Sequence, residues 1–231
     1  MKSIKYIPVI VIGLLMTFSA KAQTVEDIIG QIRAKLEKVN DYEARGKMRT
    51  NVTFIKIPVA NVKVYFKKPN KLRIKNEKGM SFIPKGSVNL NLGGILATTG
   101  GYDFIDVGTE KGSNLRIIKL LPKEDTAEVV LSTLYIDEKQ MVIKKAKTTT
   151  RENGTYELEM TYGKYSEYGL ADKVIFSFNT KDYKLPKGVT FDYDDGTAEK
   201  EKNKLQNRKG KVEITYSGYI INKGVSDEVF Q

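Results

Sequence analysis

The hydrophobic residues of segment 24–40, TVEDIIGQIRAKLEKVN, recur at every third or fourth position, which is the period of an α-helix. Thr24 is a suitable N-cap, the acidic Glu26 and Asp27 fall in the first turn, and Asn40 is a suitable end. The pattern predicts one amphipathic helix that lies on an apolar surface. Its apolar positions are Val25, Ile28, Ile29, Ile32, Leu36 and Val39.

From Tyr42 onward the hydrophobic period changes to two, which is the pattern of a β-strand with one buried face and one solvated face. Residues 42–55 follow this alternation over the longest stretch. The sequence RENG at 151–154 predicts a tight hairpin, because Asn-Gly supplies the positive backbone angles of such a turn. The other predicted strands are 61–66, 128–136, 140–150, 155–162, 173–178 and 211–221.

Two stretches break the alternation. Residues 86–106, GSVNLNLGGILATTGGYDFID, carry glycine pairs on both sides of the apolar Ile95 and Leu96. This composition predicts a movable loop with room for a short second helix. Residues 196–211 mix charges of both signs and contain almost no apolar side chain, so we expect an exposed loop or a long hairpin tip.

One helix followed by antiparallel strands predicts a single α+β domain with a sheet of about nine to eleven strands. A helix of about 17 residues can cover only part of the apolar face of such a sheet. The uncovered part must be packed by other elements, closed into a barrel, or left as a cavity for an apolar ligand. The strand residues on this face include Met48, Val52, Phe54, Val62, Val64, Phe66, Leu72, Ile74, Leu158 and Met160.

The segment YFKKPNKLRIK at 65–75 places basic residues around one proline, in a chain of formal net charge +11. The alternation directs Phe66, Leu72 and Ile74 to the apolar face, while Pro69 and Asn70 turn the chain between two strands. A phosphate-binding patch is the alternative interpretation. Because lysines are spread over the whole chain and alternate with apolar residues, we interpret most of them as the solvated faces of strands.

Residues 1–22 have the features of a signal peptide, with Lys2 and Lys5 before the apolar run YIPVIVIGLLMTF and small residues at Ala20 and Ala22. The apolar run is short for a membrane span. We therefore expect cleavage near Ala22 and Gln23, a mature chain of residues 23–231 and a location in the periplasm. Because the chain has no cysteine, no lipid anchor is expected at Gln23.

The composition excludes several kinds of chemistry. Without cysteine there are no disulfides and no thiolate nucleophiles, and without histidine the commonest general base and the commonest zinc ligand are absent. The glycine pairs lack the spacing of nucleotide-binding loops, and DYDDG at 192–196 departs from a calcium loop. Carboxylates for a glycosidase are present, but nothing brings a particular pair together. We expect no enzyme activity, no cofactor, no metal and no nucleic-acid partner.

Several elements, taken in order, resemble the LolA-type outer-membrane lipoprotein carriers and their lipoprotein-sorting relatives. They are the leader, the helix before KVNDYEARGKM, the strand ending in VYFKKPNKLRI, then FIPKG, RIIKLLPKED, LSTLYIDEKQMVIKKAKTTT, FSF and LPKGVTFDYDD. The resemblance runs from about Thr24 to about Asp195. Residues 196–231 form a C-terminal extension beyond it.

The resemblance implies a strongly curved antiparallel sheet, an unclosed β-barrel, lidded by the N-terminal helix and by short helices or loops. In the family, the basic residue before the proline and an apolar residue after it govern transfer and retention of the cargo. These positions are Lys68 and Leu72 here, where well-studied carriers have Arg and Phe, and a lysine lacks the forked donors of arginine. Ile95 and Leu96 would belong to the moving lid.

The resemblance further implies a monomeric carrier that takes acylated lipoproteins or lipids from an inner-membrane donor complex to an outer-membrane acceptor. A free lipid or glycolipid carrier, an envelope sensor of mislocalised lipoprotein and a secreted hydrolase are the alternatives. The expected acyl-binding residues are Ile28, Ile32, Leu36, Met48, Val52, Phe54, Val62, Val64, Phe66, Leu72, Ile74, Leu158 and Met160.

Overall fold

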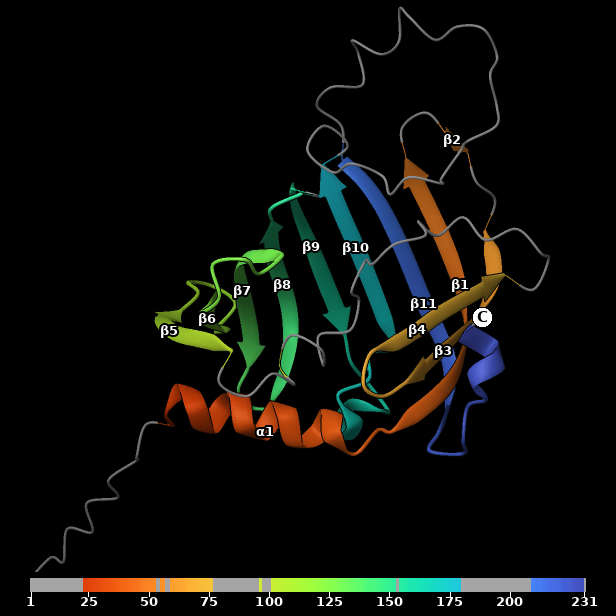
Figure 1. Cartoon of the computed structure of the whole chain (residues 1–231), viewed down its shortest axis with the longest axis horizontal. Coiled ribbons are helices and arrows are strands. Elements are labelled where there is room, and N and C mark those ends of the chain that lie inside the picture. The colour runs from red at the N-terminus through yellow and green to blue at the C-terminus, as the bar shows by residue number, and fades with distance from the viewer. Residues whose placement is uncertain are drawn as a thin grey trace, which may run out of the picture.

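A computed structural model describes residues 23–52, 55–56, 59–76, 96, 101–152, 154–179 and 209–230. In this part of the chain one large antiparallel sheet stands over a single α-helix, which crosses one end of the sheet (Figure 1). The strands are β1 (Asp41–Val52), β2 (Ile55–Lys56), β3 (Ala60–Lys67), β4 (Lys71–Asn76), β5 (Tyr102–Thr109), β6 (Arg116–Pro122), β7 (Val129–Asp137), β8 (Val142–Thr150), β9 (Gly154–Thr161), β10 (Lys173–Asn179) and β11 (Lys209–Ile221).

Helix α1 (Val25–Glu37) begins where the sequence predicts. The Thr24 hydroxyl accepts a hydrogen bond from the Asp27 amide at 3.1 Å, and the Asp27 carboxylate accepts one from the Thr24 amide at 3.3 Å. This capping box satisfies two amides that the first helical turn leaves without partners. The helix ends at Glu37, three residues before the predicted Asn40. Its buried residues are Ile28, Ile29 and Ile32.

The strand order is β4-β3-β1-β11-β10-β9-β8-β7-β6-β5, with β2 paired to β1 outside this path. Within the described residues β4 and β5 are the two free edges, so the curved sheet does not close. The expectation of an α+β fold with an unclosed barrel is therefore confirmed. Two short 3-10 turns, η1 (Ser166–Tyr168) and η2 (Asp227–Phe230), accompany the sheet.

Strand β11 lies in the middle of the sheet, between β1 and β10. It belongs to the segment that we expected to extend past the family resemblance, and it joins the two halves of the molecule. The predicted loop at 86–106 is wrong at its end, because Tyr102 begins edge strand β5, which pairs with β6. The exposed Ile105 and Val107 of this edge obscured its alternation.

A β-bulge interrupts the pairing of β1 with β11. Arg45 pairs with Gly218 but Gly46 pairs with Tyr216, so Ser217 is the extra residue. A Cβ atom on Gly46 would lie 2.6 Å from the Thr215 carbonyl oxygen, which explains why glycine is needed there. As a result, Tyr216 and Tyr219 can both face the concave side although they are three residues apart.

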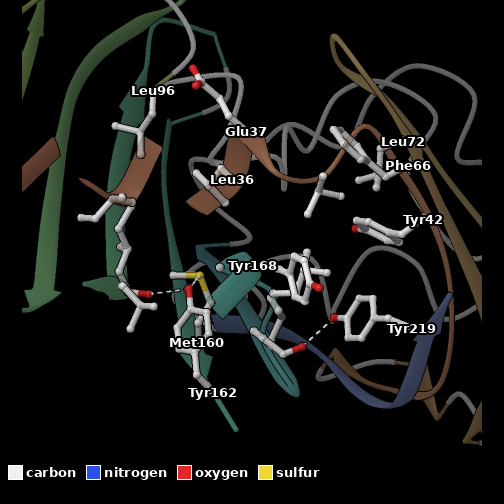
Figure 2. Close-up of a pocket in the computed structure, with 18 of the residues that line it drawn as sticks. Leu36, Glu37, Tyr42, Phe66, Leu72, Leu96, Met160, Tyr162, Tyr168 and Tyr219 are labelled. Atoms are coloured by element: carbon white, nitrogen blue, oxygen red, sulfur yellow. Dashed lines mark hydrogen bonds between the residues drawn. The ribbon is translucent and has the colours of Figure 1, made fainter. Parts of the chain in front are cut away.

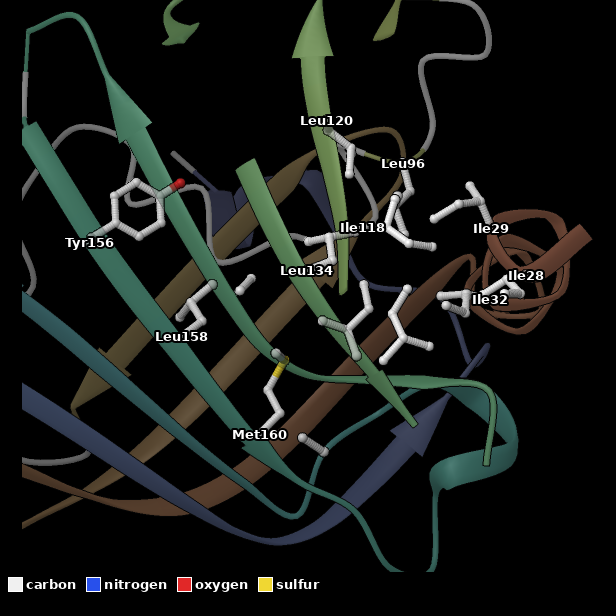
Figure 3. Close-up of a cluster of buried hydrophobic side chains, with 14 of the residues drawn as sticks. Ile28, Ile29, Ile32, Leu96, Ile118, Leu120, Leu134, Tyr156, Leu158 and Met160 are labelled. Atoms are coloured by element: carbon white, nitrogen blue, oxygen red, sulfur yellow. The ribbon is translucent and has the colours of Figure 1, made fainter. Parts of the chain in front are cut away.

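Buried apolar side chains form two separate clusters. The larger one joins α1 to β6–β10 and is seen with Ile28, Ile29 and Ile32 of the helix facing the sheet (Figure 3). The smaller one joins β1, β3, β4 and β11 and contains Ala44, Met48, Val62, Val64, Ile74 and Ile214. The helix thus packs on one half of the concave face and leaves the other half to the strands.

A pair of hydroxyl groups is buried inside the concave sheet. Ser132 on β7 and Thr148 on β8 are 0% and 1% exposed, and their side-chain oxygens lie 2.9 Å apart. Each hydroxyl satisfies the other in a region from which water is excluded, and Thr148 also shares a hydrogen bond with the Tyr156 hydroxyl.

The chain after β11 crosses to the outer face of the β3–β4 hairpin. In η2, the Asp227 carboxylate accepts a hydrogen bond from Lys71 at 2.8 Å and lies 3.1 Å from the Lys67 ammonium. Arg73 also donates to the Phe230 carbonyl oxygen at 3.3 Å. The hydrogen bond from Lys71, together with Lys67, holds the pKa of the Asp227 carboxyl below its usual value.

The buried hydroxyl pair predicts an asymmetric response to mutation. Thr148→Val leaves the Ser132 hydroxyl buried without its partner and should lower the free energy of unfolding by about 1–3 kcal/mol. Adding Ser132→Ala removes that hydroxyl and should recover part of the loss. Urea unfolding monitored by circular dichroism measures both values. A double variant less stable than Thr148→Val would contradict the prediction.

The pKa of Asp227 predicts how acid affects the C-terminal turn. Because the folded pKa is depressed, the attachment is complete above the ordinary Asp pKa of about 3.9 and is lost as the pH falls through the lower folded value. Asp227→Asn should detach η2 at neutral pH, as measured by amide NMR shifts of residues 225–230. Glu228→Gln is the matched control, since no described ion pair involves Glu228. Identical shifts in the two variants would argue against an electrostatic attachment.

Candidate functional site

A cavity of about 570 Å³ lies on the concave side of the sheet, where the helix no longer covers the strands. It is bordered by α1, by the concave faces of β1, β3, β4 and β8–β11, and by the segment that follows η1. Its lining residues are Ile32, Arg33, Leu36, Glu37, Val39, Tyr42, Val64, Phe66, Lys68, Pro69, Leu72, Ile74, Leu96, Met141, Val142, Ile143, Met160, Tyr162, Tyr168, Gly169, Leu170, Ala171, Val174, Tyr216 and Tyr219.

The cavity has an aliphatic end and an aromatic end (Figure 2). Leu36 of α1, Leu96 and Met160 of β9 lie toward one side (Figure 2). These side chains are apolar and form no directional hydrogen bonds with a ligand. The flexible methionine side chain can adjust to the shape of the ligand. This end suits a hydrocarbon chain.

The aromatic end is built from rings of β1, β3 and β11. Tyr42 stacks on Phe66 with ring centroids 5.3 Å apart, and its ring meets Tyr219 edge-on at the same distance. Tyr219 also contacts Tyr216 at 5.1 Å and Tyr165 at 5.0 Å. These contacts hold the rings in fixed orientations along the cavity wall.

The tyrosine hydroxyls in this wall differ in their hydrogen bonding. Tyr219 donates to the Ala171 carbonyl oxygen at 2.6 Å, and Tyr162 donates to the Ile143 carbonyl oxygen at 2.9 Å. Among the described residues, the Tyr168 hydroxyl of η1 has no hydrogen-bond partner, and neither do the hydroxyls of Tyr42 and Tyr216 in the strands. Burial raises the pKa of the Tyr42 and Tyr216 hydroxyls well above the usual value, so both remain neutral at physiological pH.

Cationic side chains border the cavity where α1 meets the strands. Lys68, in the turn between β3 and β4, donates to the Glu37 carbonyl oxygen at 2.8 Å and to the Asn40 side-chain oxygen at 3.4 Å. The bond to Glu37 satisfies a carbonyl that the end of the helix leaves free. Arg33 of α1 also borders the cavity and donates its Nε to the Leu96 carbonyl oxygen at 2.8 Å.

The predicted site residues divide into three groups by position. Nine of them border the cavity: Ile32, Leu36, Val64, Phe66, Lys68, Leu72, Ile74, Leu96 and Met160. Ile28 and Leu158 are packed into the larger core cluster instead, and Met48 and Val62 into the smaller one. Phe54, Ile95 and the side chain of Val52 lie outside the described residues.

The tyrosines are the main lining residues absent from the predicted site. Tyr42 and Tyr162 lie on the apolar side of an alternating pattern, so this pattern was a signal for them. Tyr216 and Tyr219 break the alternation, because an ordinary strand would place residues three apart on opposite faces. The intervening Ser217-Gly218 was the one sign of a bulge.

The described residues contain no cluster of three or more acidic side chains that could hold a metal ion. No helix among them is both long enough and apolar enough to span a bilayer.

Comparisons with known proteins show similarity in structure. No protein-family model matches the sequence, and no curated protein matches it significantly. A solved structure of a LolA superfamily protein from Nitrosomonas europaea has a TM-score of 0.53 at 12% identity, over 91% of this chain and 98% of its own. An outer membrane lipoprotein-sorting protein domain from Vibrio parahaemolyticus has a TM-score of 0.52 at 11% identity, over 88% and 94%.

A DUF1329 family protein from Desulfovibrio piger is similar over 91% of this chain and 98% of its own, with a TM-score of 0.50 and 12% identity. Identities this low bear on the fold alone. Together with the open curved sheet and the cavity beneath it, these structures show that the chain has a LolA-like fold.

Proposed function

We propose that this protein is a periplasmic, non-enzymatic carrier that binds the acyl chains of lipoproteins in its cavity and moves them toward the outer membrane. The observation that supports this most strongly is a cavity of about 570 Å³ on the concave face of the sheet. This volume lies within the range of about 300–1,000 Å³ typical of small-molecule sites. The names of two similar structures, a lipoprotein-sorting domain and a LolA superfamily protein, agree with the proposal.

The cavity has the lining that acyl-chain binding requires. Each methylene group removed from water contributes about 0.8 kcal/mol, so a chain of about sixteen carbons represents on the order of 10 kcal/mol. Ile32, Leu36, Leu96, Ile143 and Met160 offer an apolar surface for such a chain. No covalent chemistry is needed for this binding.

The polar groups at the cavity give little support to catalysis. Glu37 is the single carboxylate among the described residues that line it, and the sequence contains neither histidine nor cysteine. A pair of carboxylates, as glycosidases use, therefore has no second member among the described residues that line the cavity. The geometry favours a carrier over the hydrolase alternative.

The bond between Lys68 and α1 provides a latch for this carrier. It joins the β3–β4 turn to the last turn of the helix, and both elements border the cavity. A ligand can enter or leave when α1 and this turn separate. Lys68 is exposed, so its bond contributes modestly and can open readily.

Purification from a native envelope tests the proposed function. The protein should co-purify with acylated protein that mass spectrometry detects, because the apolar cavity retains acyl chains. Co-purified free lipid alone would favour the free-lipid alternative. A protein recovered without any acyl ligand, and unable to take up a fluorescent apolar probe, would refute the carrier proposal.

Removal of the latch should accelerate ligand release. We expect Lys68→Met to raise the dissociation rate of preloaded N-phenyl-1-naphthylamine about two- to fivefold, because one exposed charge-assisted hydrogen bond is lost. Stopped-flow fluorescence measures this rate. Lys75→Met, on the outer face of β4, is the matched control and should release the probe like the unmodified protein. Equal rates for both variants would contradict the latch.

A further inference from the structure

The aromatic end of the cavity differs from the aliphatic end in one chemical property that the proposed function does not use. It presents hydroxyl groups inside an otherwise apolar space, and Figure 2 shows the Tyr42 hydroxyl directed toward the cavity, away from the β1 backbone. A hydrocarbon chain cannot form hydrogen bonds with these hydroxyl groups. Their presence in the wall suggests that the ligand carries a polar atom at this depth.

The unpartnered hydroxyls of Tyr42 and Tyr216 in the strand wall create a cost that depends on the ligand. Water in an empty cavity can hydrogen-bond to Tyr42 and Tyr216. A ligand that displaces this water must supply an acceptor, or else both hydroxyls stay buried without a partner. The hydroxyls of Tyr162 and Tyr219 impose no such requirement, because carbonyl oxygens of the protein already accept from them.

Because the tyrosine hydroxyls in the wall are neutral, they favour a neutral hydrogen-bond acceptor on the ligand. Neutral tyrosines donate one hydrogen bond each and suit a neutral carbonyl oxygen. A carboxylate would require a cation beside it. The cations bordering the cavity, Arg33 and Lys68, bind the carbonyl oxygens of Leu96 and Glu37 at the α1 side, whereas the tyrosines come from β1 and β11.

The positions of the two hydroxyls are fixed by their surroundings. The ring of Tyr42 is held between Phe66 and Tyr219, and that of Tyr216 lies against Tyr219. The bulge at Ser217, made possible by Gly46, brings Tyr216 onto the same side as Tyr219. Donors on rigid rings in a sheet can recognise a group by position as well as by chemistry.

We infer that Tyr42 and Tyr216 form a recognition site for the ester or amide carbonyl of an acyl ligand, whose hydrocarbon chain extends toward Leu36 and Met160. This inference rests on the proposed function and adds the chemical class of the ligand. The cavity selects acyl esters or amides over plain hydrocarbons of equal length, because only the former replace the displaced water.

The test compares methyl laurate with tridecane as competitors of N-phenyl-1-naphthylamine, using the full-length mature protein. In the double variant Tyr42→Phe/Tyr216→Phe, affinity for methyl laurate should fall about tenfold relative to tridecane, as expected for two neutral hydrogen bonds. Because the same two probes are measured with both proteins, their different solubilities in water cancel in the ratio. If the double variant does not fold, the single variants Tyr42→Phe and Tyr216→Phe are measured in its place.

Two control variants remove hydroxyls of another kind. Tyr162→Phe lies in the cavity but its hydroxyl is already bonded, so it should affect both probes alike. Tyr135→Phe lies on the outer face of β7, where its ring faces Lys145, and should change neither affinity. A lower methyl laurate affinity in Tyr42→Phe/Tyr216→Phe alone supports the inference.

The outcomes separate this inference from the proposed function. If the unmodified protein is recovered without an acyl ligand and does not bind N-phenyl-1-naphthylamine, the carrier proposal fails and the recognition site fails with it. If the probe binds but the ratio of methyl laurate to tridecane is the same in all variants, the recognition site alone is refuted. The lauric acid anion serves as a third competitor. If Tyr42→Phe/Tyr216→Phe loses affinity for this anion but not for methyl laurate, the choice of a neutral carbonyl is refuted.

Discussion

Among the described residues, the one helix that covers the concave face of the sheet is α1, and the sheet is too wide for it. With 13 residues, α1 is about 20 Å long. Ten strands side by side span roughly 40 Å at the usual strand spacing. The helix therefore packs on one half of the sheet, where Ile28, Ile29 and Ile32 complete the larger core cluster. The cavity lies where that packing ends.

The cavity of about 570 Å³ is partly open, so water can enter it when no ligand is bound. The tyrosine hydroxyls can hydrogen-bond to that water, whereas the apolar part of the wall cannot. An apolar group that replaces the water against this part of the wall is therefore favoured by the hydrophobic effect.

The sequence predicts the local elements better than the site. Thr24 and the spacing of isoleucines place the helix, because capping and period are local properties. Alternation likewise predicts which residues of β3 and β4 face inward. The edge strand β5 was missed because Ile105 and Val107 are exposed on the face opposite the packed Tyr102 and Phe104, so its apolar residues do not alternate with polar ones. Nor can alternation distinguish a residue in the packed core, such as Met48, from one at the cavity, such as Phe66.

The pairing of β1 with β11 has a consequence for how the molecule assembles. Thr50 pairs with Val212 and Tyr42 with Ile221, so the first strand finds one of its neighbours at the far end of the chain. Contacts between such distant segments form late and slowly, because the chain entropy of closing a long loop opposes them. While a polypeptide emerges gradually from a ribosome or a translocation channel, β1 can pair with β3 but must wait for β11. The aromatic end of the cavity therefore forms last. A chain that still lacks β11 has an incomplete cavity and cannot enclose a ligand too early.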